Sequence, residues 1–135
     1  MYYIDTPTRC VREYEYDIQH GALGNSRICI RIPENEGLPD GMTIDTDGML
    51  WIAHWEGYRV SRWDPQKGNK LGEVHVPAKN VTCCTFGGPK LDILFITSAA
   101  YGISGIESEM QPFAGALFTA HTGCTGYPDN IVKLN

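Results

Sequence analysis

Asp40 is the residue whose surroundings most directly suggest chemistry, because it lies in the segment Pro39-Asp40-Gly41-Met42. A carboxylate is the kind of oxygen ligand that a hard divalent cation prefers. A bound cation polarises a carbonyl group and lowers the pKa of water, and both effects serve hydrolysis. The same residue types also favour a simple turn. The motif alone supports a metal site and a turn equally.

Other catalytic signatures are missing from the sequence. There is no His-Glu-x-x-His motif and no Gly-x-Ser-x-Gly elbow, so a zinc protease and a serine hydrolase are not supported. Asp45 and Asp47 flank a hairpin signal, and we interpret both as solvated turn residues rather than as part of a calcium-binding loop. Three histidines have no partner at metal-binding spacing: His20, His75 and His121.

The composition excludes several classes of protein. The chain has 135 residues, 42% of them hydrophobic and 20% charged, which is typical of a globular protein with one core. The formal net charge is −5 and no Lys/Arg cluster is present, so we expect no nucleic acid and no anionic membrane as the main partner. No apolar run approaches the roughly 20 residues of a membrane helix. We also expect no signal peptide.

The cysteines predict a reducing environment. There are five, an odd number, and they form no C-x-x-C pair. Cys83 and Cys84 are adjacent, so their side chains would point to opposite faces of a strand and could not share a metal. We interpret the cysteines as small packing residues of a cytoplasmic protein without disulfides.

Short β-branched and aromatic runs separated by turn residues indicate an all-β protein. Asp47-Gly48 is a tight hairpin signal, and Gly21–Asn25 is expected to break another run. The one predicted helix is a turn or two near Glu107–Gln111, closed by Pro112. The expected strands are Met1–Asp5, Cys10–Tyr16, Arg27–Ile32, Met42–Asp45, Leu50–Trp55, Arg59–Trp63, Gly72–Val76, Thr82–Phe86, Leu94–Ser98 and Ala116–Ala120.

The strands repeat along the chain. Met1–Asp5 aligns with Leu50–His54 at an offset of about 49 residues, and Leu94–Ser98 repeats the pattern about 44 residues later. Periods of roughly 40–50 residues with several short strands are typical of propeller blades. This predicts a partial β-propeller over residues 1–135, with repeats of approximately 1–36, 37–80 and 81–135. The alternative is an antiparallel β-sandwich, whose strands also alternate.

Four segments carry a specific resemblance. They are Tyr2–Pro7, Gly37–Asp45 followed by Gly48–Ala53, Arg59–Pro65, and Val81–Pro89 leading into Leu94–Ala99. In this order and spacing they closely resemble the C-terminal half of the regucalcin (senescence marker protein), gluconolactonase and luciferin-regenerating enzyme family. The resemblance covers nearly the whole chain.

The resemblance implies a six-bladed β-propeller, of which this chain would be the C-terminal half of about three blades. It implies a hydrolase of sugar lactones that uses one divalent cation (Ca²⁺, Zn²⁺ or Mn²⁺) in the central channel. Asp40 lies in the family's Pro-Asp-Gly-Met motif, so it carries over as the metal ligand and as the catalytic proton acceptor. The family's other two ligands, a Glu and an Asn, lie upstream of this chain.

Three further residues are candidates for substrate binding. His54 and Trp55 follow a strand whose end would face the channel, and related propellers place an aromatic residue there against the substrate. Ser98 holds the equivalent place one repeat later. The alternative for the first two is packing between blades, where most propeller aromatic residues are found.

Two functional interpretations remain open. In the first, the chain is a gluconolactonase-type enzyme that is competent only when the missing half is supplied, by a second copy in a homodimer or by a complementing N-terminal half. In the second, it is a non-catalytic truncated paralogue or fragment with at most weak Ca²⁺ binding. One carboxylate makes a poor site by itself, because Ca²⁺ usually takes 6–8 oxygens.

Overall fold

The computed structural model describes residues 1–130. Strands dominate it, and the helical elements are two short 3₁₀ turns, Thr6–Thr8 and Glu34–Glu36, and one α-helix, α1 (Ile106–Met110). The strands are β1 (Tyr2–Asp5), β2 (Cys10–Asp17), β3 (Ala22–Arg31), β4 (Leu38–Ile44), β5 (Leu50–Trp55), β6 (Arg59–Asp64), β7 (Asn69–His75), β8 (Asn80–Gly87), β9 (Ile93–Ala99) and β10 (Leu117–His121). The prediction of an all-β protein is therefore confirmed.

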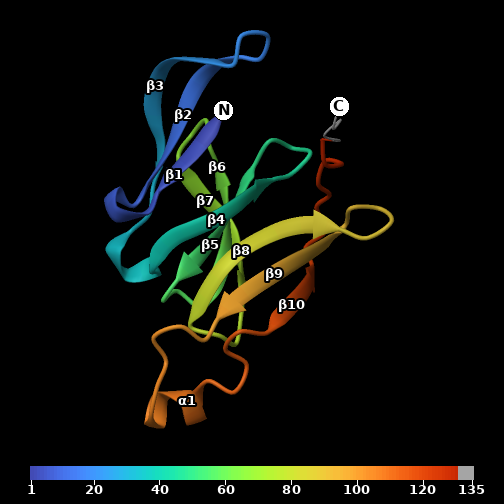
Figure 1. The fold of residues 1–135 in the computed structure, drawn as a ribbon. Helices are drawn as coiled ribbons and strands as arrows, with labels where there is room; N and C mark the ends of the chain where they lie inside the picture. The colour runs from blue at the N-terminus through green and yellow to red at the C-terminus, as the bar shows by residue number, and fades with distance from the viewer. Residues whose placement is uncertain (131–135) are drawn as a thin grey trace, which may run out of the picture.

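The strands form three antiparallel sheets that follow one another along the chain (Figure 1). The orders are β1-β2-β3, β4-β5-β6-β7 and β8-β9-β10, so only neighbours in sequence pair. Equivalent strands share a register: Ile4 of β1 pairs with Val11, as Ala53 of β5 pairs with Val60. The division of the chain into propeller repeats stays a prediction.

The middle sheet is covered on both faces, and this explains why β5 is apolar apart from His54. Leu50–His54 is completely buried. One cluster joins the middle sheet to the first sheet, and its buried members are Val11, Cys29, Ile30, Ile32, Leu50, Ile52 and Trp63. A second cluster joins it to the third sheet, and its buried members are Trp51, Ala53, Val60, Val76, Ala78, Val81, Cys84, Phe86, Leu94 and Ile96.

The turns follow the local sequence closely, with two differences. Gly48 has φ +78°, as the predicted Asp47-Gly48 hairpin requires. The break predicted at Gly21–Asn25 is wrong in part, because β3 already begins at Ala22. Pro39–Gly41 is not a turn either, because β4 begins at Leu38 and includes it. Both segments are held in the extended state by pairing with a neighbouring strand, which overrides their turn preference.

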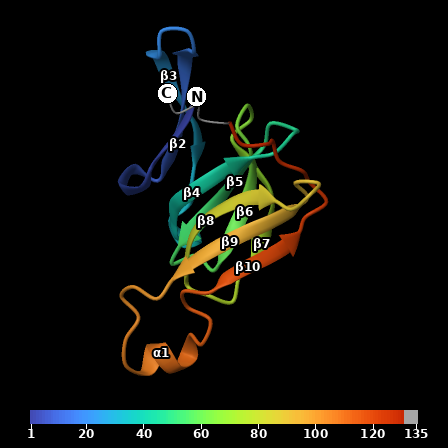
Figure 2. The ribbon, with the colours of Figure 1, turned by 45° about the vertical axis from the view of Figure 1, so that its right-hand side comes forward.

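The first strands of the middle and third sheets, β4 and β8, lie side by side. Both views show the long connection between β9 and β10, which carries α1, at the end of the molecule where β4 and β8 begin (Figures 1 and 2). The opposite end holds the β4–β5 hairpin, to which Thr125 bonds through Thr46. None of the helices in residues 1–130 has the length and apolar character needed to cross a bilayer.

Candidate functional site

Asp40 lies in a β-bulge of β4. Pro39 pairs with His54 and Met42 pairs with Ile52, so Asp40 and Gly41 together face one residue of β5, Ala53. A bulge of this kind turns a side chain away from the regular alternation of a strand. The sequence Asp-Gly thus sits at the one irregular place in β4.

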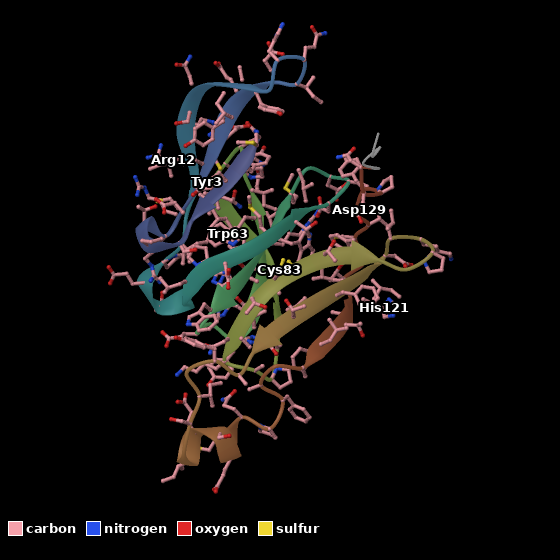
Figure 3. All side chains as sticks on the ribbon, in the orientation of Figure 1. Tyr3, Arg12, Trp63, Cys83, His121 and Asp129 are labelled. Atoms are coloured by element: carbon pink, nitrogen blue, oxygen red, sulfur yellow. The ribbon has the colours of Figure 1, made fainter. Side chains whose placement is uncertain are left out.

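Gly41 allows this bulge to lie against β8. A Cβ at this position would be 2.5 Å from the Cys83 Sγ and 2.8 Å from the Thr82 carbonyl oxygen. Figure 3 shows Cys83 on β8, facing β4. Because any larger residue would collide with β8, the glycine fixes how closely the two strands approach beside Asp40.

The Asp40 carboxylate has no hydrogen bond and no ion pair within residues 1–130. It is half-buried, and this burial raises its pKa. A partly desolvated carboxylate without a cationic partner is a fitting ligand for an added cation. The residues of this chain therefore fit a divalent cation through one carboxylate.

His54 has a different environment from the one predicted. Its side chain is completely buried, with Nδ1 2.8 Å from the Glu36 carbonyl oxygen and Nε2 2.5 Å from the Ser61 Oγ. The Glu36 carbonyl oxygen can only accept, so Nδ1 carries the imidazole proton and the neutral Nε2 accepts from the Ser61 hydroxyl. The Ser61 Oγ also accepts from the Trp63 indole at 2.6 Å. Burial lowers the pKa of His54 to about 4. This geometry assigns His54 a structural role that fixes the start of β4.

Ser98 is also engaged within the protein. Its Oγ donates to the Ala116 carbonyl oxygen at 2.8 Å and accepts from the Gly115 N–H at 3.1 Å. These bonds anchor the end of the connection that carries α1. Substrate binding by Ser98 stays a prediction without support from its contacts.

Trp55 meets an aromatic residue that the sequence interpretation did not single out. Its ring centroid lies 6.4 Å from that of Tyr101, and the two planes are inclined by 51°. Trp55 is only partly buried, and Tyr101 is 80% exposed. The only feature of the sequence that could have pointed to Tyr101 is its position. Tyr101 follows β9, and β9 is the strand equivalent to β5, which ends at Trp55.

A second acidic group, Asp45 with Asp47 and Cys124, lies at the opposite end of β4. The prediction that Asp45 is solvated is wrong, because it is 0% exposed. Its carboxylate accepts from the N–H groups of Asp47 and Met49, from the Trp51 indole at 2.9 Å and from the Arg62 Nε at 2.7 Å.

These partners decide what the second acidic group can do. Burial alone acts to raise the pKa of Asp45, but the hydrogen bonds from Arg62 and Trp51 lower it overall. A cation here would have to displace the Arg62 guanidinium from a saturated carboxylate. This group therefore does not fit a metal ion and is better described as a structural network.

The protein is thus an all-β protein built of consecutive small antiparallel sheets. The first strand of the middle sheet, β4, carries a carboxylate, Asp40, that has no partner within residues 1–130. Residues 1–100 match the family described as the SMP-30/Gluconolactonase/LRE-like region. The chain belongs to this family, as its motifs predicted.

Individual relatives agree with this assignment. The chain is 44% identical to a regucalcin of Danio rerio over 95% of its length and 44% of the relative's. It is 40% identical to the pentonolactonase XacC of Haloferax volcanii over 96% of its length and 45% of the relative's. A crystal structure titled as a calcium-binding regucalcin of Agrobacterium tumefaciens superposes with a TM-score of 0.91 at 28% identity, over 98% of this chain and 45% of that one. The chain thus spans less than half the length of these relatives.

Proposed function

We propose that this chain supplies the C-terminal half of a six-bladed β-propeller that hydrolyses sugar lactones. The observation that carries the proposal is Asp40, a half-buried carboxylate that no group in residues 1–130 neutralises. Membership of the family supports the reaction class. The name of the relative XacC, a pentonolactonase, supports a sugar lactone as the substrate.

The residues of this chain would act in the following way. Asp40 would hold a divalent cation (Ca²⁺, Zn²⁺ or Mn²⁺), which when bound polarises the lactone carbonyl and acidifies water. Asp40 would accept a proton from the attacking water. The proton then passes to the ring oxygen as its bond to the carbonyl carbon breaks, which gives the open hydroxy acid.

The remaining oxygen ligands must come from outside this chain. We propose either a second copy, which would form a homodimer closed around a common channel, or a complementing N-terminal half. Light scattering of the purified chain tests the first option. A mass of two chains supports it, and a well-folded monomer contradicts it.

A non-catalytic role is the second candidate, and a specific observation favours it. Asp40 is one carboxylate, whereas Ca²⁺ takes 6–8 oxygens, and the chain spans 44% of the length of the Danio rerio regucalcin. In this case the chain would bind a cation weakly and turn over nothing.

A lactonase assay with and without EDTA separates the two candidates. The enzyme proposal expects lactone hydrolysis above the spontaneous rate, loss of this activity with EDTA and its return with Ca²⁺, Zn²⁺ or Mn²⁺. It also expects the Asp40→Ala variant to be inactive. Hydrolysis at the spontaneous rate with every metal would contradict it for this chain.

A cytoplasmic location is a further part of the proposal, based on the cysteine content.

A further inference from the structure

Two aromatic side chains from neighbouring sheets meet at the end of the molecule where β4 begins. Trp55 is the last residue of β5 and pairs with Leu38, which lies two residues before Asp40. Tyr101 follows β9 by two residues. Their ring centroids are 6.4 Å apart and their planes are inclined by 51°, so the pair forms an open angle rather than a flat stack.

Tyr101 is held in place by its backbone and not by burial of its ring. The buried Asn80, which is 3% exposed, donates its Nδ2 to the Tyr101 carbonyl oxygen at 3.0 Å. Further along the same connection, Gln111 accepts from the Lys79 N–H at 3.0 Å. A large ring that is anchored and yet 80% exposed is available for a ligand.

We propose that Tyr101 and Trp55 form an aromatic wall that stacks against the apolar face of a sugar lactone ring, with Tyr101 making a favourable contact with the substituent on that ring. The inference rests on the proposed lactonase function, because it specifies the substrate of the same site. The wall lies at the same end of the middle sheet as the Asp40 bulge.

The chemistry of a sugar lactone suits such a wall. Its C–H groups give the ring an apolar face, which aromatic side chains bury favourably, while its hydroxyl groups stay in water. The inclined Tyr101 ring would contact an exocyclic carbon, which a six-carbon 1,4-lactone carries in a longer chain than a five-carbon one. Tyr101 is therefore a specificity-determining residue, and its ring rather than its hydroxyl makes the contact.

The test uses the fluorescence of the whole chain. Trp51 and Trp63 are each 4% exposed, so Trp55 is the tryptophan that acrylamide can reach. We expect D-galactono-1,4-lactone to protect Trp55 from acrylamide, and the open-chain galactonate to give no protection. In Tyr101→Ala, the concentration of D-galactono-1,4-lactone that gives half of the maximal protection should rise about three- to tenfold. The corresponding concentration of D-xylono-1,4-lactone should rise by less. Tyr101→Phe should behave as the wild type.

Tyr127→Ala is the matched control, because Tyr127 is 55% exposed and its hydroxyl bonds to Thr46 at the other end of β4. No protection by the lactone in the wild type would overturn the wall, and so would equal protection in Tyr101→Ala. Turnover measured on the same samples distinguishes a failure of the lactonase proposal from a failure of the aromatic wall. Protection without turnover contradicts the lactonase and supports the wall, whereas turnover without protection contradicts the wall alone.

Discussion

The two ends of β4 carry aspartates in opposite states. Asp40, in the bulge, is half-buried and has no partner within residues 1–130. Asp45, just past the last residue of the strand, is fully buried and accepts four hydrogen bonds, one of them from the charged Arg62. The difference separates a carboxylate that stabilises the fold from one that is available for a ligand.

Removal of the Asp45 carboxylate should have the largest effect on stability. Asp45→Ala would leave the Arg62 Nε and the Trp51 indole without their acceptor, and the loss of one partner of a buried ion pair costs about 3–5 kcal/mol. Urea unfolding followed by tryptophan fluorescence measures this loss. Asp47→Ala is the control, because Asp47 is 71% exposed and makes one bond to Arg62, so it should cost less than about 1 kcal/mol. Equal losses would remove the distinction between a buried network and a surface pair.

The stability of the protein should also depend on the neutral state of His54. Burial lowers its pKa from 6.5 to about 4, and Arg59 and Lys70 act in the same direction against Glu36. Between pH 6.5 and pH 4, His54 is protonated in the unfolded chain but stays neutral in the folded chain. The contribution of His54 to stability should therefore be constant above pH 6.5 and fall by roughly 3 kcal/mol as the pH decreases to 4.

Urea unfolding at half-unit pH steps tests this dependence. In His54→Gln the slope between pH 4 and 6.5 should largely disappear, whatever the variant's stability at pH 7. An unchanged slope in the variant would assign the acid sensitivity to other groups.

The close approach of β4 and β8 beside Asp40 should depend on Gly41. In Gly41→Ala the new Cβ would lie 2.5 Å from the Cys83 Sγ, so the two strands must move apart, at a cost of about 1–3 kcal/mol. Gly72→Ala is the matched control, because nothing lies within 4 Å of a Cβ there. Denaturant midpoints that are the same for both variants would show that β4 has room to move.

Removal of the Asp40 carboxylate should have the smallest effect on stability. Asp40→Ala breaks no bond within residues 1–130 and removes a half-buried charge, so the free energy of unfolding should change by less than about 0.5 kcal/mol or increase slightly. A large loss in urea unfolding would show that Asp40 is a structural residue like Asp45.

The strands and the family were readable from the sequence because both depend on local signals. Alternating runs and turn residues located every strand, with β4 and β3 extended beyond their predicted starts by pairing with neighbours. Asp40 became a candidate through its motif. The true state of Asp45 was not predicted, because its burial depends on Arg62, 17 residues away in sequence.

The same limit applies to the other residues around the site. His54 looked like a pocket residue from its place at the end of a strand, and only the contacts with Glu36 and Ser61 show that both ring nitrogens are occupied. Tyr101 lies in no motif, and only its contact with Trp55 across two sheets singles it out. Sequence spacing cannot give such contacts between distant segments.

Calorimetric titration of the chain with Ca²⁺, repeated with Zn²⁺ and Mn²⁺, tests the contrast between the two aspartates most directly. We expect the wild type and Asp47→Ala to bind a cation with similar affinity, and Asp40→Ala to give only the heat of dilution. Loss of binding in Asp47→Ala with binding retained in Asp40→Ala would contradict the assignment of the cation to Asp40. That result would place the cation at the Asp45 end of β4.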